Sequence, residues 1–328
     1  MTTTEAPWSP GSVTVTRAAS RSAILRRVEL EVTRRLDGLL TGEFLGHLPG
    51  PGTDPAQARL YGPGDDARRI DWNLSARALA PHVRTTEADH ELETWMVADA
   101  SASMDFGTAL CEKRDLVLAT VAAFGFMSLR GGNRFGLVTT GPEGCSRRPA
   151  LSSRTALLAA LRQLYDAPRR QSRPETDGDL ATGLIHVAGI HRRRGRVVVV
   201  SDFLDEASWA KPLQRLTARH EVIAVQVVDP RELDLPDVGL LGVVDTETGR
   251  VLHVQTSSAR LRARYRTAAQ ARQDHITSVL RSAGTQQLKL STDRDWLLDI
   301  ARFAARAHRG QRRSAAIPRS TFTSRSSS

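Results

Sequence analysis

The sequence Trp95-Met96-Val97-Ala98-Asp99-Ala100-Ser101-Ala102-Ser103 carries an apolar run directly into a carboxylate and two hydroxyls. The apolar run is typical of a buried strand, and the polar side chains after it are typical of a loop between a strand and a helix. Oxygen ligands of this kind suit a Mg²⁺-like cation, which uses one or two carboxylates and keeps several waters. Serine and alanine are common residues, so the motif needs support from the rest of the chain.

Strand-like and helix-like segments alternate around this motif. Strands are expected at 92–99, 135–140, 145–151, 197–200, 222–228 and 287–291, with a hairpin at 239–254. Helices are expected at 109–129, 153–165, 179–192, 206–219, 257–283 and 295–307. The uniformly β-branched run Val197-Val198-Val199-Val200 predicts a central strand. The pattern predicts an α/β fold: a doubly wound, mostly parallel six-stranded sheet with helices on both faces.

Composition divides the chain into four parts. Residues 1–20 are polar and contain two prolines, so we expect them to be disordered. Residues 21–90 form an N-terminal extension with a helix expected at 22–41, and residues 91–307 form the sheet domain. Residues 308–328 are expected to be a flexible basic tail rich in serine and arginine.

Charge and cysteine usage exclude several classes of protein. Residues 300–328 contain seven arginines and no acid, which leaves only +3 of the net charge of +10 for the rest of the chain. The chain has just three lysines, and this general bias toward arginine argues against a dedicated nucleic-acid surface. Two cysteines make neither a disulfide framework nor a zinc site. The absence of a signal peptide and of a long apolar run predicts a cytoplasmic protein without a membrane span.

The polar ends of two predicted strands are expected to meet. The first strand ends at Asp99, and the valine-rich strand ends at Ser201-Asp202. In an open parallel sheet, ligands collect at the carboxyl ends of the strands, where the strand order reverses. If the two strands are neighbours, Asp99, Ser101, Ser103 and Asp202 lie on one rim, and the loop Thr176-Asp177-Gly178-Asp179 approaches it.

Asp-x-Ser-x-Ser after a first strand, with an aspartate after a valine-rich fourth strand, resembles the metal-ion-dependent adhesion site of von Willebrand factor A domains. The resemblance implies that fold and a Mg²⁺ or Mn²⁺ ion held, directly or through water, by Asp99, Ser101, Ser103 and Asp202. The family also uses a threonine, and here Gly178 stands at that position. Thr176, Asp177 and Asp179 are candidates to substitute for the missing hydroxyl.

A second block resembles the signature of the bacterial family called domain of unknown function 58. It runs Leu60-Tyr61-Gly62-Pro63-Gly64-Asp65-Asp66-Ala67-Arg68-Arg69-Ile70-Asp71-Trp72 and is followed by Ser75-Ala76-Arg77. Its alternating charges suggest a salt-bridged segment packed against the sheet domain. We therefore expect an interdomain clamp of Asp65, Asp66, Arg69, Asp71, Trp72 and Arg77, with a partner-binding or catalytic surface as the alternative.

The resemblance implies work beside a MoxR-type AAA+ ATPase in the assembly or maturation of client proteins. The rim lacks an evident nucleophile or general base, and the chain has no phosphate-binding loop of the Gly-x-x-x-x-Gly-Lys-Ser/Thr type. We therefore expect a non-enzymatic adaptor whose metal site binds an acidic group of a partner. Two alternatives stay open: nucleic-acid binding through the arginine-rich tail, and a metal-dependent hydrolase.

Overall fold

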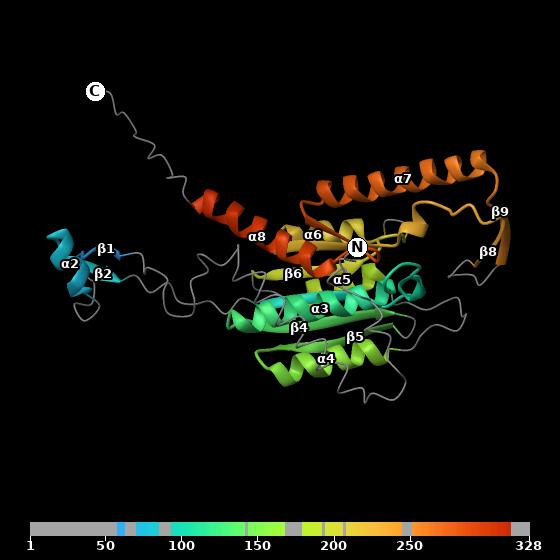
Figure 1. Cartoon of the computed structure of the whole chain (residues 1–328). Helices are drawn as coiled ribbons and strands as arrows, with labels where there is room; N and C mark the ends of the chain where they lie inside the picture. The colour runs from blue at the N-terminus through green and yellow to red at the C-terminus, as the bar shows by residue number, and fades with distance from the viewer. Residues whose placement is uncertain are drawn as a thin grey trace, which may run out of the picture.

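A six-stranded sheet forms the centre of the molecule in the computed structural model (Figure 1). The structure describes residues 58–62, 70–84, 93–141, 144–167, 179–191, 194–205, 208–244 and 251–315. The six strands are β3 (Glu93–Asp99), β4 (Arg134–Gly141), β5 (Gly144–Leu151), β6 (Arg196–Ser201), β7 (Glu221–Val228) and β10 (Gln286–Ser291). Each of the six lies within two residues of its predicted position at both ends.

The strand order is β10-β7-β6-β3-β4-β5. Counted along the chain within this sheet, this is the 3-2-1-4-5-6 order of doubly wound folds, in which the order reverses beside the first strand. Only the edge strand β5 runs antiparallel, to β4, and the other neighbouring pairs are parallel. The predicted α/β class with a mostly parallel six-stranded sheet is confirmed.

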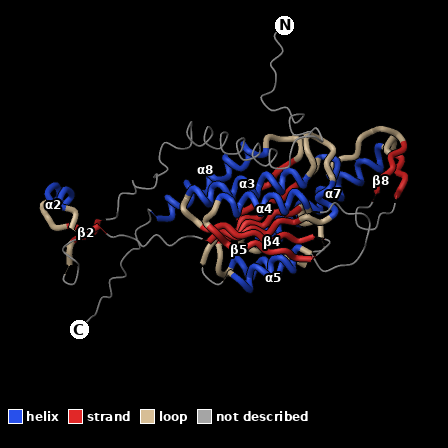
Figure 2. Tube along the Cα trace, turned by 90° about the horizontal axis from the view of Figure 1, so that it is seen from below, coloured by secondary structure: helices blue, strands red, loops and turns tan. Residues whose placement is uncertain are grey.

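Helices cover both faces of the sheet (Figure 2). One face packs against α3 (Lys113–Arg130), α4 (Arg154–Asp166) and α8 (Trp296–Ala315). The other packs against α5 (Leu180–Ile190), α6 (Ala210–Thr217) and α7 (Ala259–Ser282). Because both faces are covered, the central strands are apolar at nearly every position, and alternate residues enter opposite cores. In β6, Val198 and Val200 join the α3 side while Val197 and Val199 join the α5 side.

The ends of several elements differ from the sequence-based expectation. Helix α3 begins at Lys113, four residues later than expected, because a 3-10 turn, η3 (Ala102–Asp105), and a loop occupy the preceding residues. Helix α8 continues to Ala315, eight residues beyond the predicted end and into the segment expected to be a flexible tail. Residues 308–315 contain no proline and include three arginines, which favour helix. The helix predicted at 22–41 and the disorder predicted for residues 1–20 lie outside the described residues.

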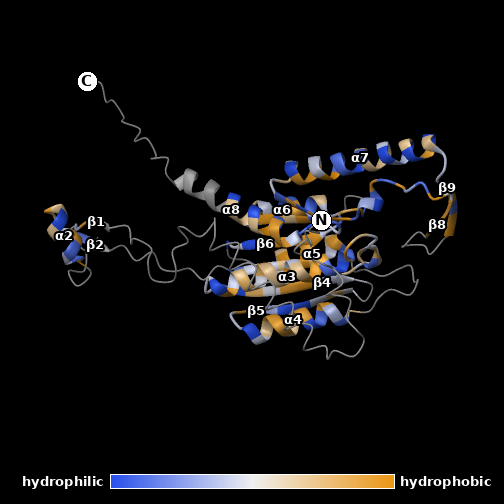
Figure 3. Ribbon diagram, in the orientation of Figure 1, coloured by the Kyte–Doolittle hydropathy of each residue, from blue (hydrophilic) through white to orange (hydrophobic). Residues whose placement is uncertain are grey.

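Two smaller units accompany the six-stranded sheet: one precedes it in the sequence, and the other is inserted between β7 and α7. Strands β1 (Ala58–Leu60) and β2 (His82–Arg84) form an antiparallel pair, and α2 (Trp72–Ala78) lies between them in the sequence. Strands β8 (Leu240–Val244) and β9 (Val251–Gln255) form the expected hairpin, whose hydrophobic colouring is visible in Figure 3. Among the described residues, no helix combines the length and the apolar character needed to cross a membrane.

Candidate functional site

Strands β3 and β6 lie side by side at the point where the strand order reverses. Ala98 pairs with Val200, so Asp99 and Ser201 follow at the same level of the sheet. Asp99 and Asp202 are both buried at this carboxyl edge. The predicted convergence of these two acids on one rim is therefore confirmed, because parallel neighbours end on the same side of a sheet.

Asp99 is held by two hydrogen bonds. Its Oδ1 accepts from the Ser101 backbone N–H at 2.8 Å, and its Oδ2 accepts from the Ser201 hydroxyl at 2.6 Å. Burial raises the pKa of Asp99 to about 6, with a further contribution from the negative charge of Asp202. The hydrogen bonds thus fix the orientation of the carboxylate, while burial disfavours its negative charge. A nearby cation would stabilise the charged form.

The two serines of the motif lie next to each other. The chain turns into η3 after Ala100, and this turn places the Ser101 and Ser103 hydroxyl oxygens 3.0 Å apart. Adjacent corners of a Mg²⁺ octahedron with bonds of about 2.1 Å are separated by about 3.0 Å. The two hydroxyls hydrogen-bond to each other, and the same spacing would suit two neighbouring ligands of one small divalent cation. Among the described residues, no group of three His, Cys, Asp or Glu side chains gathers as a metal-binding cluster.

Asp202 binds a lysine that the sequence did not single out. Its Oδ2 accepts from Nζ of Lys113 at 2.8 Å, and its Oδ1 accepts from the Leu204 backbone N–H at 3.1 Å. The same lysine Nζ lies 2.5 Å from Oε1 of Glu232, which belongs to η4 (Pro230–Glu232) after β7. A weak signal existed: Lys113 is one of three lysines in a chain that otherwise uses arginine.

A threonine from the neighbouring strand β4 completes this edge. Thr140 pairs in register with Asp99, and its fully buried Oγ1 has no hydrogen-bond partner. Helix α5 approaches closely at Gly183, where an added Cβ would lie 2.3 Å from Cγ2 of Thr140. An unpaired buried hydroxyl is unusual and leaves one oxygen beside Asp99 available for a further partner.

The expected substitutes for the missing threonine are only partly described. Asp179 is exposed and caps α5, where its Oδ1 accepts from the Thr182 backbone N–H at 2.7 Å. One carboxylate oxygen of Asp179 is therefore engaged in capping the first turn of α5. Thr176, Asp177 and Gly178 lie outside the described residues.

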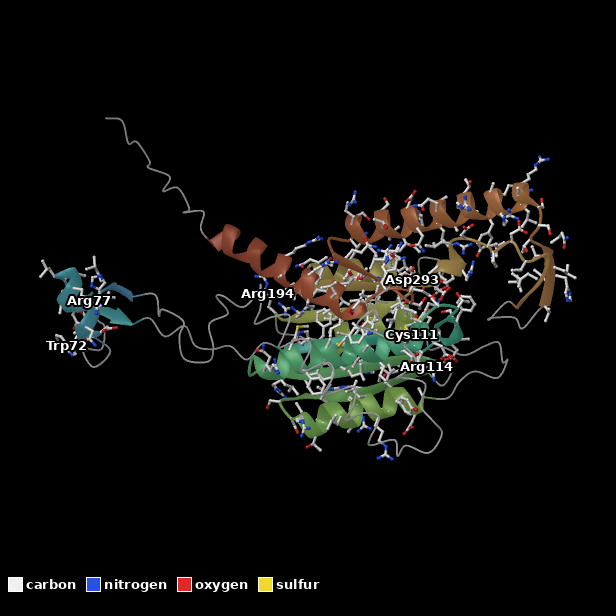
Figure 4. All side chains as sticks on the ribbon, viewed as in Figure 1. Trp72, Arg77, Cys111, Arg114, Arg194 and Asp293 are labelled. Atoms are coloured by element: carbon white, nitrogen blue, oxygen red, sulfur yellow. The ribbon has the colours of Figure 1, made fainter. Side chains whose placement is uncertain are left out.

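The signature segment is described at residues 60–62 and again from Ile70 onward, and Asp65, Asp66 and Arg69 lie outside the described residues. Asp71 caps α2 by accepting from the backbone N–H groups of Asn73 and Leu74. Trp72 is 71% exposed, and Arg77 is exposed in the last turn of the same helix (Figure 4). Helix α2 has no buried residue. The clamp as a whole stays a prediction.

Comparison with known proteins gives consistent matches over most of the chain. The model of the family described as "Protein of unknown function DUF58" matches residues 57–275. An uncharacterized protein of Mycobacterium tuberculosis is 46% identical over 289 residues, which cover 88% of this chain and 90% of that protein.

Among solved structures, BatB from Bacteroides thetaiotaomicron aligns with a TM-score of 0.43 and 11% identity, over 67% of this chain and 99% of its own. The SpRpn10 VWA domain aligns with a TM-score of 0.37 and 14% identity, over 64% of this chain and 93% of its own. The family model covers about two thirds of the sequence, and the mycobacterial identity extends over nearly all of it. The chain belongs to the DUF58 family.

Proposed function

We propose that this chain is a non-enzymatic adaptor that binds an acidic side chain of a partner protein at the rim formed by Asp99, Ser101, Ser103 and Asp202. The observation that carries the proposal is the meeting of two buried carboxylates and a hydroxyl pair at the switch point of a parallel sheet. Ligand sites of open α/β sheets lie at this position.

The residues present fit a small divalent cation, Mg²⁺ or Mn²⁺. Asp99 would contribute the carboxylate, and Ser101 and Ser103 would contribute hydroxyls that are already 3.0 Å apart. Asp202 would act through water, because its Oδ2 is already paired with the ammonium group of Lys113. When bound, the ion supplies an open coordination position that accepts a carboxylate. The side chains hold the ion in place, and Ser201 keeps Asp99 oriented toward it.

The partner that the family resemblance suggests is a MoxR-type AAA+ ATPase, or a client protein that such an ATPase remodels, in the cytoplasm. An exposed acidic side chain on either would provide the ligand. The rim offers hard oxygen ligands, which favour recognition of a carboxylate through a cation over direct recognition by an arginine.

Pull-down of a MoxR-type ATPase from the same genome by the full chain tests the proposal. We expect binding in Mn²⁺ and its loss in EDTA or in Asp99→Ala, whereas Asp274→Asn, on the exposed face of α7, should bind as the wild type does. Equal binding by Asp99→Ala and wild-type protein, with and without EDTA, would show that recognition does not use a metal bridge. A phosphoester screen with Mn²⁺ tests the enzymatic alternative, and we expect no metal-dependent turnover.

A further inference from the structure

Lys113 places a fully buried positive charge beside the proposed cation site. The side chain is 0% exposed, and its Nζ contacts Asp202 at 2.8 Å and Glu232 at 2.5 Å. The aromatic ring of Phe106 lies 5.9 Å from the same nitrogen. Burying an ammonium group is expensive unless it is paired, so the two carboxylates are needed to keep Lys113 in this position.

The rim collects more negative than positive charge. Asp99, Asp202 and Glu232 interact electrostatically through this cluster, and Lys113 is the cation that contacts two of them. The ammonium group occupies the side of Asp202 at which Oδ2 accepts a hydrogen bond, and the Leu204 N–H occupies Oδ1. A metal ion that bound Asp202 directly would have to displace the ammonium group of Lys113 from Oδ2.

Lys113 also links the rim to the loop after β7. Glu232 closes η4 by accepting from the Asp229 N–H at 3.2 Å. Asp229 in turn accepts from the Thr108 N–H at 2.8 Å and from the Thr292 hydroxyl at 2.6 Å. The lysine thus joins the first turn of α3, the end of β6 and the start of the β7–β8 connection, which fixes Asp202 relative to the sheet.

We propose that Lys113 is the resident counter-cation of the rim: it neutralises Asp202, prevents its direct ligation of a metal, and restricts a divalent ion to a weaker site built on Asp99, Ser101 and Ser103. This inference rests on the proposed function of the rim. Lys113 is in this view a positioning residue that sets the affinity of the site, because the number of charged ligands tunes affinity for such ions over several orders of magnitude.

Mn²⁺ titration of the full chain, followed by the electron paramagnetic resonance signal of the free ion, tests the inference. Lys113→Met removes the charge and keeps an unbranched side chain of similar length. We expect this variant to bind Mn²⁺ at least tenfold more tightly than the wild type, and Asp202→Asn in the same background to abolish the gain. Lys211→Met, at an exposed position on α6, is the matched control and should bind as the wild type does.

Thermal unfolding provides a second readout. In EDTA, Lys113→Met should melt at a lower temperature than the wild type, since it leaves Asp202 and Glu232 unpaired, and Mn²⁺ should restore most of the loss. If Lys113→Met does not fold, Lys113→Met/Glu232→Gln carries one unpaired acid fewer and takes its place in both measurements.

The outcomes separate this inference from the proposed function. Mn²⁺ affinities of Lys113→Met and wild type within twofold of each other would overturn the role of Lys113 and leave the metal site standing. Binding by Lys113→Met alone, with none by the wild type, would support the counter-cation and overturn the metal-bridged adaptor. Binding by neither protein would overturn both.

Discussion

The Ser201 hydroxyl donates a hydrogen bond of 2.6 Å to Oδ2 of Asp99 between the neighbouring strands β6 and β3. The hydroxyl oxygen of Ser201 also accepts a hydrogen bond of 3.0 Å from the Phe203 backbone N–H. This one hydroxyl therefore both orients the carboxylate of Asp99 and closes the turn after β6. The turn needs this support because Phe203 has a positive φ of 58°, a conformation that costs free energy for a bulky residue. Two features of the rim thus depend on Ser201.

Replacing Ser201 with alanine is expected to weaken both features. Hydrogen bonds to charged groups contribute about 1.5–3 kcal/mol, so we expect Ser201→Ala to lower the free energy of unfolding by about 2 kcal/mol. Urea denaturation measures this loss, and Mn²⁺ titration should show weaker binding. Ser201→Thr keeps a hydroxyl on Cβ and should retain most of the stability. An alanine variant as stable as the wild type would mean that the bond to Asp99 contributes nothing.

The two motif serines should affect ion binding without affecting the fold. Both are partly exposed, and their hydroxyls contact each other at 3.0 Å. Ser101→Ala and Ser103→Ala are each expected to reduce Mn²⁺ affinity about tenfold or more. Their free energies of unfolding should change by less than about 0.5 kcal/mol, as is usual for substitutions outside the core. Ser282→Ala, at the exposed end of α7, is the control. Unchanged Mn²⁺ affinity in both variants would exclude hydroxyl ligation.

Two glycines of α5 give opposite predictions for the same substitution. A Cβ at Gly183 would lie 2.3 Å from Cγ2 of Thr140 and 3.1 Å from Cγ1 of Val97. These are buried, β-branched side chains, so α5 would have to move away from the sheet, and Gly183→Ala should destabilise the protein by about 1–3 kcal/mol.

At Gly189 nothing lies within 4 Å of the added Cβ. Gly189→Ala should therefore raise stability by up to about 1 kcal/mol through helix propensity alone. Urea denaturation of the two variants measures the difference. Equal effects would mean that α5 does not touch β4 as closely as the structure places it.

A buried histidine pair at the opposite edge of the sheet predicts a pH dependence of stability. The rings of His191 and His220 stack with their centroids 4.4 Å apart, and Nδ1 of His191 lies 3.1 Å from Oε2 of Glu93. Burial, with repulsion from His191 and Arg219, lowers the pKa of His220 to about 4. In the unfolded chain a histidine has a pKa of about 6.5.

Between these two values the unfolded chain binds a proton that the folded chain does not. The contribution of neutral His220 to stability is therefore complete above about pH 6.5 and is lost as the pH falls toward 4. His220→Phe keeps a stacked ring but removes the titrating group. As the pH falls from 6.5 toward 4, the free energy of unfolding of this variant should therefore decrease less steeply than that of the wild type. Urea denaturation from pH 4.5 to 7.5 tests this, with the exposed His186→Gln as control. Identical slopes for His220→Phe and wild type would contradict it.

Hydrophobic patterning accounts for the success of the fold prediction. The continuous apolar runs at 95–98 and 197–200 required strands covered on both faces, and the alternation with helices required parallel connections. Together these placed Asp99 and Asp202 on one edge, where the structure has them. The end of α8 was predicted less well, because residues 308–315 contain no large apolar side chain and so carry no periodic signal, although their helix propensity lets the helix continue.

The sequence by itself determined the sheet, its helices and the meeting of Asp99 with Asp202, because local apolar periodicity and the direction of parallel strands are sufficient for that. Tertiary structure alone decided that Lys113 contacts Asp202, since the two residues lie 89 positions apart in the sequence. It also decided that Thr140 keeps an unpaired hydroxyl beside Asp99. Side chains that meet across loops carry no periodic signal, and only the packing of the loops against the sheet edge brings their charges together.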